Sequence, residues 1–285
     1  MTVTVARHLE PRPDGQAFAD RLSERVNQRV DGLEESSSLI DFAFSTALLA
    51  LQAHCAADPE GSRLETWKAA VTAMQLGSAL FAVTGASEGT VECFINDRPR
   101  AVPAAGPQSY ADADHWLAAF WLALVCRERE RMTQLCEIPL DRLQSPEGVY
   151  DEYVYHWIDV QQSYQLRRPG LVDKLIATIA AANPEAAVVT LPGVLDGLMY
   201  PPIHLFYLVV RGREEEFAPA LGEALDLHKT YWSAEDWAAK LDGALALGPL
   251  AMACLAFDRE FPVDVESPYL PKYLLSGGWL GEFST

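Results

Sequence analysis

The chain has 285 residues, of which 49% are hydrophobic and 22% are charged, a composition typical of a folded globular protein and not of a disordered or fibrous one. Forty acidic residues against 22 lysines and arginines leave a formal charge of −18, which opposes binding to phosphate backbones and argues against a nucleic-acid-binding protein. The same charge suits either plain solubility or an electropositive partner.

Export and membrane insertion are also disfavoured. The first residues contain no apolar run of signal-peptide length, and the longest apolar runs, 116–126 and 243–257, are short or broken by Gly-Pro, whereas a membrane span needs about 20 residues. The five cysteines are scattered and form no CxxC pair. They predict reduced, mostly buried thiols in a cytoplasmic protein.

Helical periodicity dominates the first 85 residues. Apolar residues at four-residue steps, with arginines between them, predict an amphipathic helix over 16–31. A second helix is expected to begin at Ser38 or Asp41 and to end before Pro59, and a third helix to run from about 62 to 85. The pattern then changes.

Residues 88–104 alternate weakly around a turn-like Asn96-Asp97 pair. This pattern predicts a small β-hairpin, which is the only strand pair expected in the chain.

Helices are predicted for the rest of the sequence. One is expected to run from Ser109 through the alternating charges of 127–131, which are predicted to form a solvated face with local ion pairs. Pro201-Pro202 is expected to start or kink a helix instead of lying inside one. Further helices are expected at about 149–166, 170–182, 193–211, 213–230 and 234–258.

These connections are short, and no regular repeat is present. The sequence therefore predicts an all-α fold, a single domain over 1–285 with about nine to eleven helices and the one hairpin. Residues 266–283 are expected to form an ordered apolar tail across the body of the protein.

The segment YDEYVYHWID, residues 150–159, places acids, a histidine and a tryptophan within ten residues. On a helix, Glu152, His156 and Asp159 share one face, where a histidine between two acids could act as a base. The second histidine of the HExxH zinc pattern is absent, and no other metal or cofactor motif is present. We therefore interpret the segment as a structural helix with a binding face, and catalysis there as the minor alternative.

Two other histidines are minor catalytic candidates. His204 lies on an apolar helix and is more typical of a core residue than of a ligand. His228 lies near a helix end, which favours a cationic side chain. Neither belongs to a recognisable catalytic motif, so no catalytic residue and no cofactor are predicted.

Exposed acids beside aromatic residues are the best candidates for a binding surface, because aromatic anchors ringed by polar groups carry most interface energy. Asp112 is alternatively explained by the dipole of the helix that it precedes. The candidates are Asp112, Asp114, Asp151, Glu152, Tyr155 and Asp159, together with the acidic run Glu214, Glu215 and Glu216.

Several segments along most of the chain carry a family resemblance. They are TWKAAVTAMQLGSALFA (66–82), EGTVEC (88–93), GPQSYADADHWLAAFWLALVCRERERMTQLCEIP (106–139), YDEYVYHWIDVQQSYQLRRPGLVDKL (150–175), YPPIHLFY (200–207), LHKTYW (227–232), LGPLAMACLAFD (247–258), ESPYLPKYLL (266–275) and WLGEF (279–283). These segments resemble the immunity 49 family of bacterial proteins that protect against polymorphic toxins, in its actinobacterial, Streptomyces-type branch.

The resemblance implies an intracellular helical protein that binds and neutralises a toxin, without a catalytic motif or cofactor of its own. The charge adds a physical expectation, since carboxylates could cover the substrate-binding surface of a basic nuclease toxin. No nucleic-acid or membrane partner is expected.

Two other functions are left open. One is a small-molecule enzyme or ligand carrier of actinobacterial secondary metabolism. It would use a pocket between helices, lined by Tyr155, His156, Trp157, His204 and Tyr231. The other is a cytosolic partner protein with no toxin.

Overall fold

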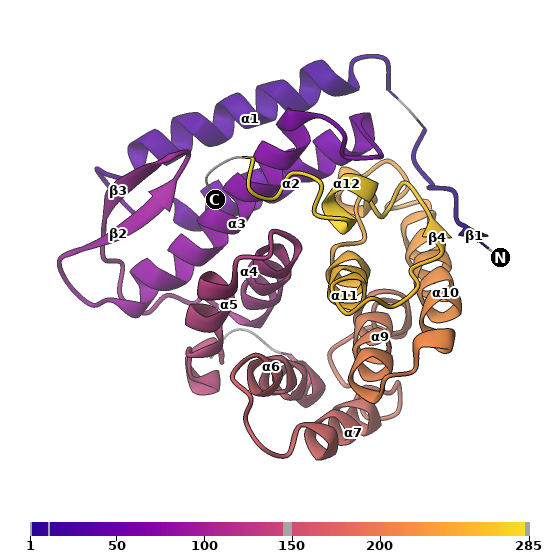
Figure 1. The fold of residues 1–285 in the computed structure, drawn as a ribbon. Helices are drawn as coiled ribbons and strands as arrows, with labels where there is room; N and C mark the ends of the chain where they lie inside the picture. The colour runs from indigo at the N-terminus through magenta and orange to yellow at the C-terminus, as the bar shows by residue number, and fades with distance from the viewer. Residues whose placement is uncertain (1, 11, 145–149, 283–285) are drawn as a thin grey trace.

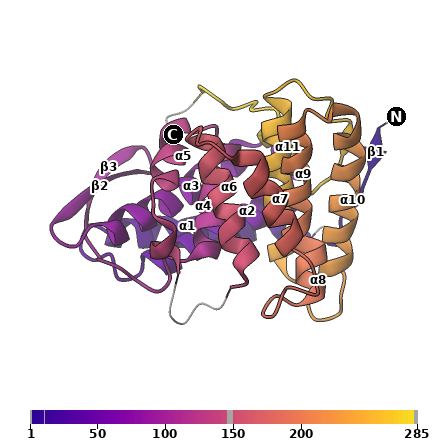
Figure 2. The ribbon, with the colours of Figure 1, turned by 90° about the horizontal axis from the view of Figure 1, so that it is seen from below.

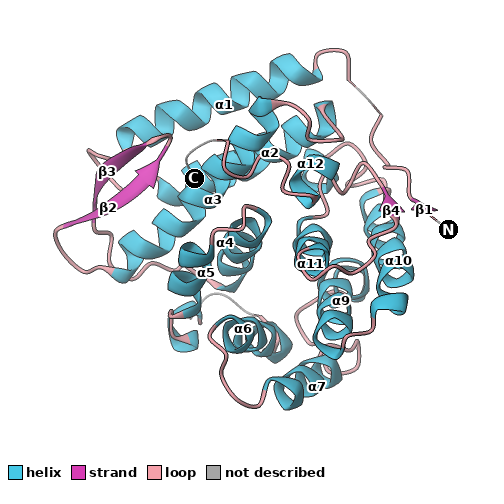
Figure 3. Ribbon diagram, in the orientation of Figure 1, coloured by secondary structure: helices cyan, strands magenta, loops and turns pink. Residues whose placement is uncertain are grey.

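The computed structural model describes residues 2–10, 12–144 and 150–282, which form α-helices and two small two-stranded sheets (Figure 3). Counting α8, a π turn at Leu195–Met199 and α9 as one continuous helix, the described residues contain eleven α-helices, and the predicted all-α fold is confirmed. The helices are α1 (Gly15–Gly32), α2 (Ile40–Ala57), α3 (Leu64–Gly85), α4 (Ala113–Val125), α5 (Arg129–Cys136), α6 (Glu152–Gln165), α7 (Leu171–Ala181), α8 (Pro192–Val194), α9 (Tyr200–Arg211), α10 (Glu214–Trp232), α11 (Leu247–Phe257) and α12 (Lys272–Leu275).

The helices are arranged as a three-helix layer beside a closed ring (Figure 1). In the layer, α1 and α3 each pack on α2. In the ring, α4 packs on α5, α5 on α6, α6 on α7, α7 on α9, α9 on α11, and α11 again on α4. The packing of α3 against α4 joins the layer to the ring, and α10 packs beside α9 and α11.

Buried aromatic side chains fill the contacts between these helices. Trp116 of α4 is fully buried and stacks on Phe120, with 4.9 Å between ring centroids. Trp157 of α6 is fully buried and meets Phe206 of α9 edge to face at 5.2 Å. Such rings bury much apolar surface each, which explains why the apolar positions of the sequence are so rich in them.

The predicted hairpin is present at one end of the molecule, opposite α10 (Figure 2). It consists of β2 (Thr90–Ile95) and β3 (Arg98–Pro103), which pair antiparallel. The two turn residues, Asn96 and Asp97, have φ values of 52° and 60°, the left-handed conformation that a two-residue hairpin turn requires and that Asn and Asp tolerate best.

A second strand pair shows that the expectation of a single pair is wrong. β1 (Val3–Thr4) pairs in parallel with β4 (Val265–Glu266). Strands of two residues are too short to produce alternation in the sequence, and their pairing depends on contacts between distant parts of the chain.

The helix expected to run through 127–131 is interrupted. It divides into α4 and α5 because Arg127 adopts φ +58°, which ends α4 after Val125. The expectation of a solvated face is also wrong for Arg127, whose side chain is 14% exposed. Its guanidinium donates to the carbonyl oxygens of Leu274 (3.0 Å) and Leu275 (2.6 Å) and pairs with Asp258 (3.0 Å).

The helix expected over 234–258 is present only in its second half, as α11. Residues 234–246 form turns and a short 3-10 helix at Leu241–Gly243. A Cβ at Gly243 would lie 2.4 Å from the ring of Trp232, so this close approach requires glycine. The prolines Pro201 and Pro202 lie in the first turn of α9, directly after the π turn.

The C-terminal segment lies across the body. Tyr269, Leu270 and Leu274 are buried, and Nε1 of Trp279 donates to the carbonyl oxygen of Gly61 (3.0 Å). By length and composition alone, two helices, Ile40–Ala57 and Pro192–Arg211, could cross a membrane. The apolar runs in the sequence predicted no membrane span. Half of the residues in the apolar window of each helix are buried inside the fold.

Candidate functional site

A cleft of about 580 Å³ lies between α1 and α3, larger than two other cavities of about 370 and 290 Å³. Its walls are α1 and α3, and its floor includes α2. Small side chains on the lining, Ala47 and Ala50 of α2 and Ala69 of α3, leave the space open. The turn of the hairpin, Asn96-Asp97, borders it as well. We call this feature the α1–α3 cleft.

The rim of the α1–α3 cleft is acidic. Among the described residues, none of four exposed rim carboxylates makes an ion pair within the protein, and Lys68 is the one lysine of the lining. A concentration of unpaired like charge around a concave surface raises the local potential and attracts cations. The four acids are Asp20 and Glu24 of α1, Glu65 of α3, and Asp97 of the hairpin turn.

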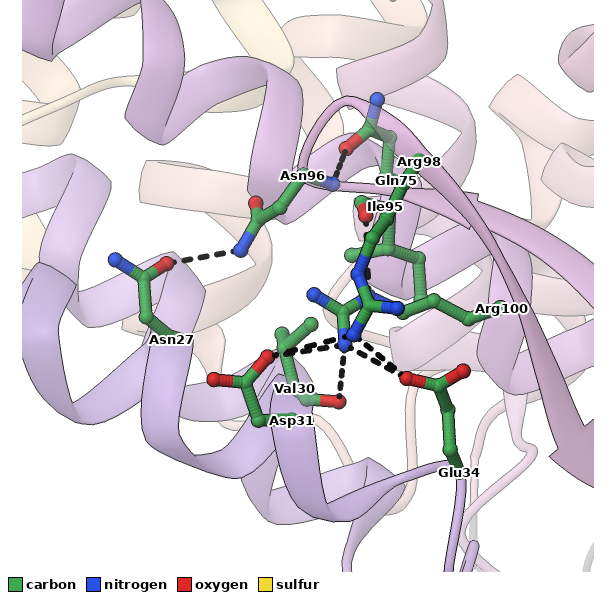
Figure 4. Close-up of polar contacts among 9 residues, drawn as sticks. All are labelled: Asn27, Val30, Asp31, Glu34, Gln75, Ile95, Asn96, Arg98 and Arg100. Atoms are coloured by element: carbon green, nitrogen blue, oxygen red, sulfur yellow. Dashed lines mark hydrogen bonds and ion pairs between the residues drawn. The ribbon is translucent and has the colours of Figure 1, made fainter.

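A chain of amide groups crosses the cleft beside the turn (Figure 4). The backbone N–H of Asn96 donates to Oε1 of Gln75 (3.0 Å). The Asn96 side chain donates through Nδ2 to Oδ1 of Asn27 on α1 (2.8 Å) and accepts from Thr72 on α3 (2.9 Å). The hairpin turn is therefore hydrogen bonded to both walls.

Two arginines fix the hairpin against the end of α1 (Figure 4). Arg100 is 4% exposed and donates to the carbonyl oxygen of Val30 (3.3 Å), to Asp31 (3.0 Å) and to Glu34 (3.3 Å). Arg98 donates to the same Glu34 (2.7 Å). Because Asp31 is engaged in this way, it lines the cleft without adding to its unpaired charge.

Three buried polar atoms of the lining have no hydrogen-bond partner among the described residues. They are Nε2 of Gln75, Nε1 of Trp67 and Nδ1 of His54, on side chains that are each 1% exposed. A buried polar group without a partner costs about 1–3 kcal/mol, so three around one cleft need an explanation.

His54 is neutral in this setting. Burial lowers its pKa, against the opposing influence of nearby acids such as Asp20. Its Nε2 hydrogen bonds with Oγ of Ser23 on α1 (2.9 Å). The orientation of Gln75 follows from its partner, since the backbone N–H of Asn96 can only donate and must meet the side-chain oxygen.

None of these cleft residues is among the predicted site residues, although one signal of the cleft is present in the sequence. Asp20, Glu24, Asn27 and Asp31 recur at steps of four, three and four residues, which places them in one stripe along α1. The depth of the cleft beside these residues depends on how α1 and α3 pack on α2, and the sequence of α1 alone does not reveal that packing.

The predicted acids Asp112 and Asp114 lie at the start of α4. Asp112 is its N-cap, as its position before the helix suggested, and accepts from the backbone N–H of His115 (3.1 Å), from Nδ1 of His115 (2.9 Å) and from Tyr150 (3.0 Å). Burial opposes its ionisation, but these hydrogen bonds lower the pKa of Asp112. Asp114 is exposed beside it. Asp112 thus has partners within the fold.

The expectation that Asp151 is an exposed acid is wrong. Its side chain is 8% exposed and accepts from the backbone N–H groups of Val188 (2.7 Å), Val189 (3.1 Å) and Thr190 (2.7 Å). Burial would raise its pKa, but these three donors lower the pKa to about 2. Asp151 joins the start of α6 to the loop before α8.

The other residues of 150–159 lie largely where the helical pattern predicted. Glu152 and His156 are exposed and share a face with Asp159, whose carboxylate pairs with Lys174 of α7 (2.7 Å). Tyr155 is half-buried and meets Tyr150 edge to face. The acids 214–216 are exposed in the first turn of α10, where Glu216 pairs with Arg213. A binding role for these residues stays a prediction.

The structure describes where the five residues expected to line a small-molecule pocket lie. Trp157 is fully buried in the core, whereas His156 on the same helix is exposed. His204 stacks on Tyr200, and Tyr231 stacks on Trp237. None of the five expected lining residues lines any of the three cavities.

The position of His228 near a helix end suggested a cationic side chain, but the residue is buried and neutral. Its Nε2 hydrogen bonds with the carbonyl oxygen of Gly243 (3.0 Å). Burial nevertheless lowers its pKa to about 4. Within the described ranges, no group of three or more His, Cys, Asp or Glu could hold a metal ion. The five cysteines are free and buried, as expected.

Comparison with known proteins gives one match. Residues 58–274 match the family described as immunity protein 49. The match begins just after α2 and ends within α12, so α1 lies outside it and α3 inside it. No curated protein and no solved structure gave a match.

Proposed function

The chain belongs to the immunity protein 49 family, and we propose that it protects a bacterial cell by binding a basic toxin, such as a nuclease, through its acidic surface. Family membership implies an immunity protein with a toxin as its partner. The proposal adds the chemistry of that toxin's surface and the means of neutralisation, namely direct occlusion of the toxin.

The observation that carries the proposal is the α1–α3 cleft, whose four rim carboxylates make no ion pair with any described residue, in a chain of formal charge −18. A nuclease must present positive charge to its phosphate substrate, so a carboxylate-rich surface competes for the same site. Attraction between opposite charges also accelerates association, which favours a protein that must reach its toxin before damage occurs.

We infer that the protein acts in the cytoplasm. Its five free and buried cysteines support this inference, because extracellular proteins more often pair their cysteines as disulfides. A nuclease toxin would also meet its substrate there.

A growth-rescue experiment tests the proposal. The gene adjacent to this one in the source genome is expressed under tight control in a sensitive host, with and without this protein. We expect growth to stop without the protein and to be restored with it, and the two proteins to co-purify as a complex that weakens as salt is raised. A toxic neighbour that this protein fails to neutralise, or a complex insensitive to salt, would contradict the proposal.

A further inference from the structure

We infer that the α1–α3 cleft binds an extended segment of polypeptide rich in arginine or lysine. This inference rests on the proposed function, in which the segment belongs to the toxin. It specifies the place of contact and the chemistry recognised there.

The rim supplies the charge selectivity. Asp20, Glu24, Glu65 and Asp97 carry negative charge on both walls and at the hairpin end, and none has an ion-pair partner among the described residues. An anion such as phosphate would be repelled from this rim, whereas guanidinium or ammonium groups would each find a carboxylate. The volume of about 580 Å³ lies within the range of about 300–1,000 Å³ that ligand sites occupy.

A ligand of the cleft must supply hydrogen-bond acceptors as well as positive charge, because two buried donors of the lining lack a partner among the described residues. Nε1 of Trp67 and Nε2 of Gln75 can only donate, and the hydrogen bond from the Asn96 N–H to Oε1 of Gln75 fixes which end of that amide is the nitrogen. In Figure 4 this Nε2 points away from Asn96, and no described residue accepts from it. A simple polyamine has no acceptor to offer these groups.

A peptide satisfies both requirements at once, since its main-chain carbonyl oxygens accept hydrogen bonds while its basic side chains carry the charge. The free donors are buried in the free protein, so the walls must part to admit carbonyl groups. This movement would have to lengthen the hydrogen bonds of Asn96 to Asn27 on α1 and to Thr72 and Gln75 on α3, because the hairpin turn links both walls.

The rim is tested on the full chain with the peptide acetyl-Arg-Arg-Arg-amide as probe, by titration calorimetry at low salt. A triple variant, Asp20→Asn, Glu24→Gln and Glu65→Gln, is expected to lower the affinity at least about tenfold. The matched control, Glu223→Gln, Glu235→Gln and Asp236→Asn, changes the net charge equally on exposed acids of α10 and the turns after it, and should change the affinity less than about twofold. Equal effects of the two triples, or no binding of the peptide to the unmodified protein, would overturn the inference.

The donors are tested by Trp67→Phe, which removes an N–H that has no partner within the described part of the chain. The variant is expected to weaken tri-arginine binding several-fold and to leave binding of agmatine, a guanidinium without carbonyl groups, unchanged. Trp157→Phe is the control, because Trp157 is equally buried, also has an unpartnered Nε1 and lies on α6. Peptide binding that responds alike to Trp67→Phe and Trp157→Phe, or a Trp67→Phe variant that weakens agmatine and peptide binding equally, would rule out recognition of the main chain.

The two proposals fail separately. If the protein rescues growth and the rim triple binds the toxin as tightly as the unmodified protein, the toxin is bound elsewhere and the cleft inference is wrong while the immunity function stands. If the toxic neighbour is not neutralised but the peptide binds with the expected pattern, the cleft recognises basic polypeptide and the assignment of that toxin as the partner is wrong.

Discussion

At the scale of single residues, Asp151 shows how one carboxylate can organise a loop. It directly precedes α6, and its carboxylate accepts three backbone N–H groups from the segment before α8. Charge-assisted hydrogen bonds of this kind are stronger than neutral ones, and the donors would be left unsatisfied if the carboxylate were removed.

We therefore expect Asp151→Ala to lower the free energy of unfolding by about 2 kcal/mol, measured by urea denaturation at pH 7. The pKa of Asp151 is lowered to about 2, so its contribution is present above the unfolded value near 3.8 and is lost as pH falls toward 2. The difference between the variant and the unmodified protein should shrink over that range. Asp173→Ala, on an exposed acid in the first turn of α7, is the control and should have little effect.

His228 predicts a pH dependence at milder acidity. Its pKa is lowered to about 4 by burial, against about 6.5 in the unfolded chain, so only the unfolded state binds a proton between these values. The stability contributed by neutral His228 is complete above pH 6.5 and is lost as pH falls to 4, by about 3 kcal/mol. His228→Phe should flatten the curve of unfolding free energy against pH in this window, whereas replacing the exposed His156 by Gln should not. A curve unchanged in His228→Phe would show that another group causes the acid sensitivity.

At the scale of elements, Arg127 joins the α4–α5 break to the C-terminal segment. Its guanidinium donates to the last carbonyl groups of α12 and to Asp258 at the end of α11. A planar fork can meet several acceptors at once, which an ammonium group on a flexible stem cannot do equally well.

Arg127→Lys is accordingly expected to lower the free energy of unfolding by about 1–3 kcal/mol although it keeps the charge. Limited proteolysis should also cut residues 259–282 faster in this variant. Arg129→Lys changes an exposed arginine at the start of α5 and serves as the control. Identical cleavage of the three proteins would show that Arg127 does not hold the C-terminal segment.

The break at Arg127 also shows which features of the fold could not be predicted from the sequence. Apolar periodicity located α1, α2 and α3, and the Asn-Asp turn located the hairpin, because these features depend on neighbours in the chain. The break at Arg127 and the β1–β4 pair depend on partners more than a hundred residues away, and neither leaves a local pattern. At the cleft, the acidic stripe of α1 is visible in the sequence, but the free donors of Trp67 and Gln75 are not, since they follow from packing.

At the scale of the whole molecule, the charge of −18 affects folding and binding in opposite ways. Repulsion among like charges destabilises the compact state and is screened by salt, whose Debye length falls from about 30 Å at 0.01 M to about 8 Å at 0.15 M. We expect the free energy of unfolding to rise over this range, measured by urea denaturation, while the affinity for a basic partner falls. A protein stability that also falls with salt would mean that internal ion pairs outweigh the repulsion.

The closure of the helical ring has a consequence for synthesis on the ribosome. α4 ends at Val125 and its partner α11 begins at Leu247, where Gly248 lies against the ring of Trp121. About 120 residues must therefore be added before the largely apolar α4 can be covered on that side, which takes roughly 6–25 s at bacterial elongation rates. During this interval the nascent chain exposes the apolar surface of α4, and the ring of helices is incomplete. If a toxin is translated at the same time, immunity during this interval depends on copies of the protein that have already folded.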